Sequence, residues 1–331
     1  MTDFAAAEAI LTLSTAYWAS RVLHVIAGAG IADVLDDEPQ TAAALAAKAG
    51  VHPEVLHRML RCLANHGVFT LSGGRFAHNA ASRILRSDAP GSMRGRGIMD
   101  GLPVHWDAYR GLDDSLKTGR PGIEAVLDGG LFPYLATHPY EARVFQEAMV
   151  GKSYEQVGEV IGAYDFTGLD TIGDIGGGIG HLLSAVLEKY PASKGVLFEL
   201  PAAIAQAREA PHPRIAYVGG DFFKDPVPPC DAYMLMMVLH DWSDDECLAI
   251  LKNIAATAPA GAKYLIIEGM IDEDRIGDFI ADLDIEMLAW TTGRERTRAE
   301  WEELLDRAGL MLARVVPMGG FSCIVEAVAR D

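Results

Sequence analysis

Three residues that could perform acid–base chemistry lie next to apolar segments in the second half of the chain. His240 follows the almost wholly apolar run 231–239, Glu268 follows the apolar run 263–267, and Glu295 stands in the sequence Gly-Arg-Glu-Arg-Thr. An imidazole with its ordinary pKa of about 6.5 takes up a proton near neutral pH, and a carboxylate on its far nitrogen fixes the tautomer and stabilises the imidazolium. His240 is therefore a candidate general base, which we expect to be mostly uncharged at pH 7. Of the two acids, Glu268 fits the ring-holding role best.

A glycine-rich turn could bind a nucleotide-like ligand. The apolar segment that starts at Thr171 runs into Asp174, and glycines fill four of the five positions 176–180 before a helix predicted over 181–190. Glycines let a backbone approach a ligand closely, and a helix N-terminus offers free N–H groups and a positive dipole end. Glu199 ends the next apolar run, where an acid can hold the two hydroxyls of a ribose. This order of elements predicts a binding site for a ligand that contains a nucleoside.

The glycine spacing argues against a dinucleotide. The dinucleotide fingerprint requires glycine at its first, third and sixth positions, and a fingerprint that starts at Gly176 has His181 in sixth place. After a third strand, predicted over 214–218, two glycines lead to Asp221 and Phe222. A carboxylate and an aromatic ring suit the amino group and the ring face of adenine.

A mostly parallel α/β sheet would bring these residues together. The predicted strands alternate with helices, and ligands of such sheets bind beyond the carboxyl ends of the strands, where His240 would stand. Ser243 and Glu246 form a capping box that opens a helix extending to about Ala258, so the connection that carries His240 is short.

Composition limits the function classes. The chain has 331 residues, half of them apolar, which predicts two folded domains, and its net charge of −18 disfavours nucleic acid and anionic membranes as partners. The start of the chain lacks a basic signal region, and no apolar run approaches the ~18 residues of a membrane span. We expect a soluble, cytoplasmic protein. Four scattered cysteines indicate neither a disulfide framework nor a thiolate metal site.

The first 86 residues leave two functions open. Residues 4–29 predict a helix that is apolar on much of its surface and must be covered, which makes a dimer contact a natural interpretation. From Thr41 to Leu85 the pattern is helix, turn, helix and hairpin, which is typical of a winged helix and raises a DNA-binding regulator as an alternative. The second helix offers few polar positions for reading bases, so a scaffold or dimerisation role is favoured.

The motifs together resemble the small-molecule O-methyltransferase family, which includes plant caffeate and chalcone methyltransferases, bacterial polyketide and phenazine methyltransferases, and animal acetylserotonin methyltransferase. The resemblance covers almost the whole chain. It is carried by the run Asp174–Gly180 and by Phe198-Glu199-Leu200-Pro201, Gly220-Asp221-Phe222-Phe223, Leu239-His240-Asp241-Trp242-Ser243-Asp244, Glu268 and Gly293-Arg294-Glu295-Arg296-Thr297.

The resemblance implies the fold and the cofactor. It implies a Rossmann-like class I methyltransferase domain at 104–331, with a mostly parallel seven-stranded sheet that ends in an antiparallel hairpin. Before it, at 1–103, it implies a mainly helical, winged-helix-like domain that forms a homodimer. The implied cofactor is S-adenosylmethionine, which becomes S-adenosylhomocysteine, and no metal is expected.

The resemblance also assigns roles to residues. His240 matches the base, and Glu268 and Glu295 match the acids that hold its ring. Positions that match contacts to the cofactor are Ser153, Asp174, Gly176, Gly178, Glu199, Leu200, Asp221, Phe222 and Met236. Positions that match the acceptor pocket are Phe145, Met149, Asp284 and Met287.

These roles agree with the chemistry of methyl transfer. Displacement at a sulfonium requires an acceptor oxygen placed in line and removal of its proton as charge develops. We therefore expect transfer to a phenolic or enolic hydroxyl of a small, largely apolar molecule. Relatives that methylate nitrogen or carbon, or that keep the cofactor without transferring methyl, remain alternatives. Met236 and Glu199 replace the Lys and Asp common in the family, which leaves details of cofactor binding open.

Overall fold

The computed structural model of the chain describes residues 4–127, 129–275 and 279–330, without the side chains of residues 152, 153 and 155. The chain divides into two compact units, one formed by residues 1–107 with 132–155 and the other by residues 108–131 with 156–331. The domain boundary predicted after residue 103 stays a prediction.

None of the described helices is long and apolar enough to span a membrane. All four cysteines are free thiols.

The first unit is mainly helical, with one small antiparallel sheet of order β1-β3-β2. The predicted helix caps are confirmed: the Thr41 hydroxyl accepts from the N–H of Ala44, Gly50 takes the left-handed conformation at φ 69°, and Pro53 opens the next helix. The helices and strands within it are α1 (Phe4–Thr15), α2 (Tyr17–Gly28), α3 (Ile31–Val34), β1 (Gln40–Thr41), α4 (Ala42–Ala49), α5 (Pro53–Asn65), β2 (Thr70–Ser72), β3 (Arg75–Ala77), α6 (Ala80–Arg83), α7 (Arg94–Met99) and, except for its first residue, α10 (Leu131–Thr137).

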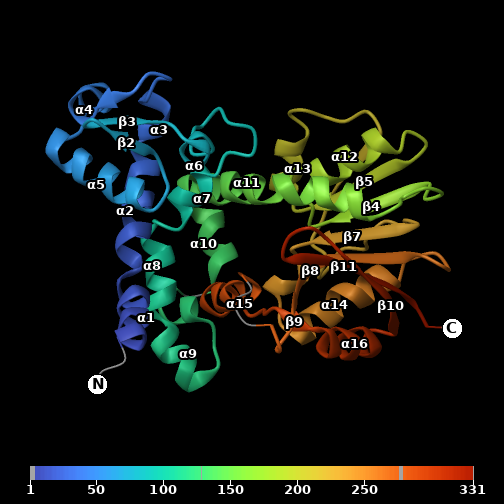
Figure 1. Ribbon diagram of the computed structural model, residues 1–331. Helices are drawn as coiled ribbons and strands as arrows, with labels where there is room; N and C mark the ends of the chain where they lie inside the picture. The colour runs from blue at the N-terminus through green and yellow to red at the C-terminus, as the bar shows by residue number, and fades with distance from the viewer. Residues whose placement is uncertain (1–3, 128, 276–278, 331) are drawn as a thin grey trace. The chain divides into compact units, whose positions relative to one another are not determined.

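The N-terminal helix predicted over 4–29 is two helices, α1 and α2, which meet at Ala16 (Figure 1). The hydroxyls of Ser14 and Thr15 both bond back to the carbonyl of Leu11, at 3.1 and 2.8 Å, and such bonds bend helices. No residue of α1 is buried, and the side chains of Phe4 and Leu13 are 88% and 75% exposed. The apolar surface of α1 is therefore uncovered in the single chain.

The second unit is built on a sheet of order β10-β11-β8-β7-β4-β5-β6, to which the short strand β9 adds beside β8 (Figure 1). Strands β4 to β8 pair in parallel, whereas β10 and β11 are antiparallel, as the family resemblance implied. The strands are β4 (Thr171–Ile175), β5 (Lys194–Glu199), β6 (Ile215–Gly219), β7 (Ala232–Met236), β8 (Lys263–Ile271), β9 (Arg296–Thr297), β10 (Leu310–Pro317) and β11 (Ser322–Ala329).

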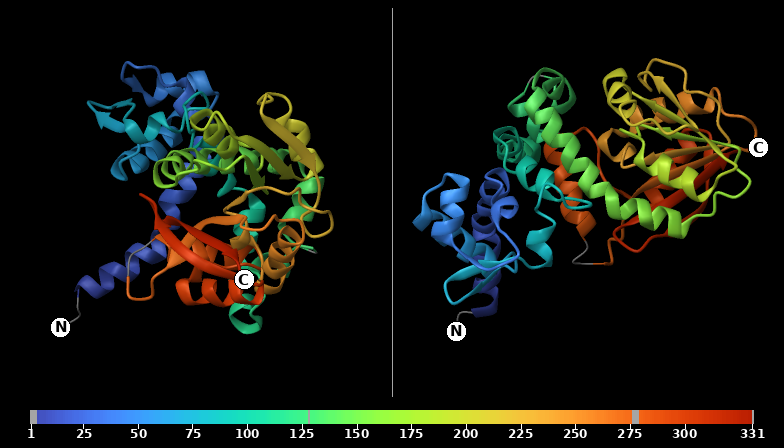
Figure 2. Two further views of the ribbon diagram at one scale, coloured as in Figure 1. Left: turned by 90° about the vertical axis from the view of Figure 1, so that its right-hand side faces the viewer. Right: turned by 90° about the horizontal axis from the view of Figure 1, so that it is seen from above.

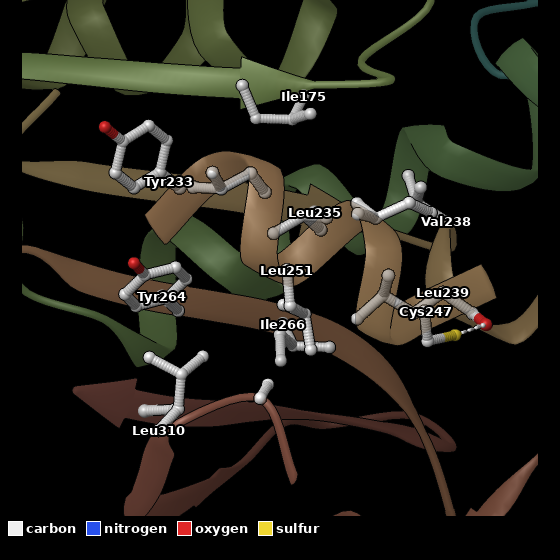
Figure 3. Packing of buried hydrophobic residues seen from close by; sticks show 14 of the residues in the cluster. Ile175, Tyr233, Leu235, Val238, Leu239, Cys247, Leu251, Tyr264, Ile266 and Leu310 are labelled. Atoms are coloured by element: carbon white, nitrogen blue, oxygen red, sulfur yellow. Dashed lines mark hydrogen bonds between the residues drawn. The ribbon is translucent and has the colours of Figure 1, made fainter. Parts of the chain in front are cut away.

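Helices cover both faces of this sheet (Figure 2). Alternate residues of one strand point to opposite faces, so Tyr233 and Leu235 of β7 belong to one buried cluster and Ala232 and Met234 to the other. Figure 3 shows the first cluster, in which β7 and β8 pack against Leu251. The other helices are α8 (Pro103–Arg110), α9 (Leu112–Thr118), η1 (Gly122–Ala125), α11 (Pro139–Ala163), α12 (His181–Lys189), α13 (Pro201–Ala207), η2 (Leu239–Asp241), α14 (Asp244–Ala255), α15 (Phe279–Trp290) and α16 (Arg298–Arg307).

Two strand ends differ from the sequence prediction. Strand β7 ends at Met236 rather than next to His240, because Met237 takes a left-handed conformation at φ 54° that an extended strand cannot continue through. The residues after it form η2, a turn of 3₁₀-helix that includes His240. Strand β8 runs to Ile271 and thus contains Glu268 instead of ending before it. The predicted capping box of Ser243 and Glu246 is confirmed at the start of α14.

Candidate active site

The glycine turn follows β4 and leads directly into α12. Gly176, Gly178 and Gly180 have φ values of 69°, 59° and 81°, a region in which residues with a Cβ are strained. Gly177 is required for another reason: a Cβ there would lie 2.3 Å from the carboxyl carbon of Asp174. The turn is therefore shaped by its backbone, and the carboxyl group of Asp174 lies directly beneath it.

Two acids accompany this turn. The Glu199 carboxylate accepts hydrogen bonds from the N–H groups of Gly178, at 3.1 Å, and Leu200, at 2.6 Å. Asp174 is 1% exposed, and its Oδ2 has no hydrogen-bond partner among the described residues. Burial, with the nearby charge of Glu199, raises the pKa of Asp174 to about 7. A buried carboxyl oxygen without a partner is costly, which suits a site where a ligand supplies hydrogen-bond donors.

The residues predicted to contact adenine lie after β6. Asp221 accepts the N–H of Phe223 at 2.9 Å and pairs with Lys224 at 2.7 Å; the bond from Lys224 holds the pKa of this carboxyl below its usual range. Phe222 packs edge-on against Phe223 and Trp242. The Leu200 side chain is 51% exposed. Met236, the last residue of β7, packs against the sheet core.

The structure brings His240 and both predicted acids together. His240, Glu268 and Glu295 are 4%, 0% and 3% exposed. The Nδ1 atom of His240 lies 2.7 Å from Oε1 of Glu295 and 3.7 Å from Oε2 of Glu268. Its Nε2 atom lies 3.6 Å from a carboxylate oxygen of Asp241. The three segments that meet here are widely separated in the sequence.

The two acids have different tasks. Both acids were predicted to hold the ring, with Glu268 favoured, but it is Glu295 that makes the hydrogen bond to the ring. The Oε1 atom of Glu268 instead accepts the backbone N–H groups of Val238 and Leu239, at 3.0 and 2.9 Å. Glu268 therefore holds the backbone of the turn that carries His240, whereas Glu295 holds its ring.

This environment changes the protonation of His240. Burial by itself would lower its pKa, but Glu268, Asp241 and Glu295 outweigh burial and raise the pKa of His240 to about 9. The expectation of an uncharged ring at pH 7 is therefore wrong for this structure. Burial raises the pKa of Glu268, while the positive charge of His240 acts against that rise. The ring is a stronger base than an ordinary histidine, and it must lose a proton before it can accept one.

The predicted acceptor-pocket residues fall in different places. Asp284, on α15, accepts the backbone N–H of Glu295 at 2.8 Å and so supports the acid that holds the ring. Met287 is buried on the same helix and belongs to a cluster that Met237 packs against. Phe145 and Met149 are partly buried on α11 within the first unit. The side chain of Ser153 lies outside the described part of the chain.

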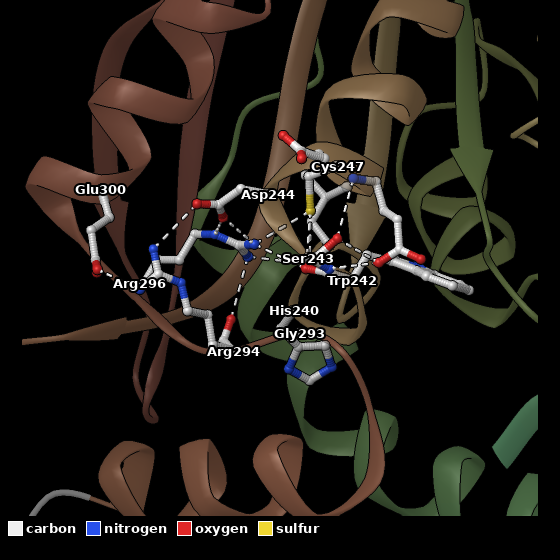
Figure 4. A network of polar contacts seen from close by, with 12 residues as sticks. His240, Trp242, Ser243, Asp244, Cys247, Gly293, Arg294, Arg296 and Glu300 are labelled. Carbon is white, nitrogen blue, oxygen red and sulfur yellow. Dashed lines mark hydrogen bonds and ion pairs between the residues drawn. The ribbon is translucent and has the colours of Figure 1, made fainter. Parts of the chain in front are cut away.

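Sequence reasoning missed Arg296, whose side chain has 0% exposure. It lies among Trp242, Asp244 and Cys247 beside the turn that carries His240 (Figure 4). The sequence feature that could have pointed to it is the second arginine of the Gly-Arg-Glu-Arg-Thr segment. Only the glutamate of this segment is assigned a role from the sequence. The support that Asp284 gives to Glu295 was also missed, because it depends on packing that the sequence does not display.

Comparison with known proteins decides the family. Residues 109–311 match the O-methyltransferase domain, and residues 11–88 match the O-methyltransferase dimerisation domain. The chain belongs to the small-molecule O-methyltransferases. This O-methyltransferase, which depends on S-adenosylmethionine, therefore carries the dimerisation domain of its family where the winged-helix pattern was seen.

Its relatives act on several kinds of small molecule. The chain is 38% identical to a phenazine O-methyltransferase of Lysobacter antibioticus, over 96% of this chain and 95% of the relative. It is 35% identical to a mitomycin biosynthesis 6-O-methyltransferase of Streptomyces lavendulae, over 98% and 95% of the two chains. An 8-amino-8-demethylriboflavin N,N-dimethyltransferase of Streptomyces davaonensis is 34% identical over 92% of this chain and 90% of its own.

Solved structures agree with this membership. The crystal structure of LaPhzM matches with a TM-score of 0.92 and 38% identity, over 98% of this chain and 99% of the other. The human N-acetylserotonin methyltransferase in complex with S-adenosylmethionine matches with a TM-score of 0.91 and 26% identity, over 100% and 99% of the two chains. The O-methyltransferase fold is therefore shared along the whole chain.

Proposed function

We propose that this enzyme methylates a phenolic or enolic hydroxyl of a small, largely apolar acceptor, with His240 as the general base. The observation that carries the proposal is the 2.7 Å hydrogen bond between Nδ1 of His240 and the buried carboxylate of Glu295. This bond fixes the ring and its tautomer, and it leaves Nε2 as the nitrogen that can take up the proton of the acceptor.

The glycine turn and its neighbours suit S-adenosylmethionine. Bound cofactor would supply a methyl group on a positively charged sulfur, which an acceptor oxygen can attack directly. We assign Gly176, Gly178 and Asp174 to its methionine part, because Asp174 is a buried carboxyl with an unused oxygen atom among the described residues. Glu199 is assigned to the ribose, since its carboxylate lies against Gly178. The remaining assigned contacts are Ser153, Leu200, Asp221, Phe222 and Met236.

The raised pKa of His240 favours a phenolic or enolic acceptor. The pKa of His240 is raised to about 9, close to the value of about 10 of a phenol such as tyrosine. Proton transfer between groups of similar pKa costs little free energy, whereas an aliphatic alcohol would hold its proton too tightly. The buried Met287 would supply an apolar wall that an aromatic acceptor needs. Phe145 and Met149 stay predicted acceptor contacts. Asp284 contributes indirectly, through the backbone of Glu295.

We also infer a homodimer formed through the N-terminal domain. The whole length of α1 is uncovered in the single chain, although Phe4, Ile10, Leu11 and Leu13 are apolar. Apolar surface of this extent is rare on a protein that stays monomeric. The match of residues 11–88 to a dimerisation domain supports the same inference.

Methylation of an aromatic amine is the second candidate. It is favoured by the 34% identity to a relative named as an N,N-dimethyltransferase. An amine acceptor that is already neutral attacks through its lone pair before it loses a proton, so it needs a base less than a hydroxyl does. The two candidates therefore differ in how strongly turnover depends on His240.

The test compares the wild type with His240→Ala on hydroxylated and amino-substituted aromatic acceptors, with mass spectrometry of the products. We expect the variant to lose turnover of the hydroxyl acceptor by ~10² or more, because general-base catalysis contributes that much. Its affinity for S-adenosylhomocysteine, measured by calorimetry, should not change. A variant that methylates the hydroxyl at the wild-type rate would exclude His240 as the base. Wild-type activity on the amine alone would favour the second candidate.

A further inference from the structure

Arg296 is a buried cation that the chemistry described above does not use. We propose that it is a positioning residue, which fixes the turn that carries His240 against the segment that carries Glu295. The inference rests on the proposed role of His240 as the base. It assigns a task to the second arginine of the Gly-Arg-Glu-Arg-Thr segment.

The guanidinium of Arg296 bonds to both sides of His240 in the sequence. Its Nη1 donates to the carbonyl of Leu239 at 3.2 Å, and its Nη2 donates to the carbonyl of Trp242 at 3.0 Å. These carbonyls belong to the short η2 turn and to the residue that follows it. A planar group with several fixed donors can hold two carbonyl groups at a set separation, which the ammonium of a lysine cannot do.

The same side chain is anchored to rigid elements. Its Nε and Nη2 atoms both donate to Oδ1 of Asp244, at 3.0 and 2.8 Å, and Asp244 is the first residue of α14. The guanidinium carbon lies 5.2 Å from the centre of the Trp301 ring on α16. Figure 4 shows this network around Trp242, Asp244 and Cys247. The turn is therefore tied to two helices through one residue.

The backbone on either side of Glu295 is held as well. Gly293 lies so close to the turn that a Cβ there would fall 1.9 Å from the carbonyl oxygen of His240. Arg296 pairs with Met270 in the parallel contact of β9 with β8. Glu295 lies between these two fixed points, so a shift of Arg296 would move Glu295 relative to the imidazole.

Stability alone is a weak reason for this arrangement. Arg296 is buried, but Asp244 is 33% exposed, and an ion pair of this kind adds little net stability compared with well-packed apolar side chains. Two of the donors of Arg296 instead go to carbonyls in the turn that carries His240, where an error of about 1 Å can cost about 10² in rate. We therefore attribute the buried charge of Arg296 to the need to position His240 for catalysis.

The test compares Arg296→Met and Arg296→Lys with the matched control Arg294→Met. Arg294 also pairs with Asp244, but its side chain is 47% exposed. For each variant we would measure kcat, KM, the affinity for S-adenosylhomocysteine, the pH profile of kcat/KM, and the ¹⁵N NMR signal of His240 Nδ1. For Arg296→Met we expect kcat to fall by roughly 10 to 100-fold, with unchanged cofactor affinity and an acid limb at lower pH.

Arg296→Lys should lose less of kcat but still lose the NMR signature of the bond to Glu295. A folded Arg296→Met whose kcat, pH profile and NMR signal match those of Arg294→Met would overturn the proposal. If Arg296→Met does not fold, Arg296→Lys decides by the same readouts: loss supports the proposal and wild-type values overturn it. The NMR signal reports the His240–Glu295 contact without turnover. A failed role for His240 as base, seen with His240→Ala, is thus distinguishable from a failed role for Arg296.

Discussion

The glycine turn and the corner around His240, by which we mean His240, Glu268 and Glu295, lie on the same sheet but are built in different ways. The turn is one continuous stretch, 174–180, shaped by the backbone conformations of its glycines. The corner joins side chains from three distant segments, and His240 and the Glu295 carboxylate that bonds to its ring are 55 positions apart in the sequence. A contiguous backbone site is specified by local sequence, whereas a site of converging side chains is specified by packing.

The largest effect should follow from breaking the turn with Gly177→Ala. The new Cβ would lie 2.3 Å from the buried carboxyl group of Asp174, which must move. Losing one or two well-placed polar contacts costs about 1.5–3 kcal/mol, or roughly 10 to 150-fold in affinity. We expect calorimetry to show this loss for S-adenosylhomocysteine. The control Gly162→Ala, on α11 with open space around it, should bind as the wild type does. Equal affinities would mean that Asp174 has no part in binding.

The same contrast explains what the sequence could predict. The order of strand, glycine turn and helix after Thr171 and the helix caps at Thr41 and Ser243 depend on neighbouring residues, and they were predicted correctly. The end of β7 was missed because Val238 and Leu239 continue the apolar run, and nothing in the sequence marks Met237 as left-handed. The contact of Glu268 with the backbone rather than with the ring was missed because both acids are present, and only their three-dimensional placement distinguishes them.

A smaller effect, confined to the corner, is expected of Glu295→Gln. Glu295 is one of the groups that raise the pKa of His240, so its neutral replacement should lower that pKa from about 9. Since we propose the uncharged ring as the base, we expect activity to fall as pH drops below about 9, where the ring becomes charged. The acid limb of kcat/KM should therefore move to lower pH by about one unit or more, while the plateau falls because a neutral amide no longer stabilises the imidazolium or fixes the tautomer of the ring.

The control for this shift is Glu302→Gln, which removes an exposed carboxylate from α16 that pairs with Arg298. It should leave the acid limb in place, since a screened surface pair contributes little. An acid limb that stays unchanged in Glu295→Gln would show that another group controls the profile. Cofactor affinity should be unchanged in both variants, because the glycine turn does not depend on the corner.

The smallest effect should come from metal removal, even though the buried cluster His240, Glu268 and Glu295 could offer three ligands to an ion. Two ligands of one metal at about 2.0–2.2 Å each lie about 3 Å or more apart. The Nδ1 and Oε1 atoms of His240 and Glu295 are only 2.7 Å apart, which is the distance of a direct hydrogen bond. The acids after His240 already have partners: Asp244 pairs with Arg296, and Glu246 is part of a capping box.

We therefore expect kcat and KM to be unchanged after dialysis against EDTA. If turnover is lost and added Mg²⁺ or Zn²⁺ restores it, the cluster of His240, Glu268 and Glu295 would be a metal site rather than the proposed base with its two acids. The proposal that the cofactor binds at the glycine turn would not be affected.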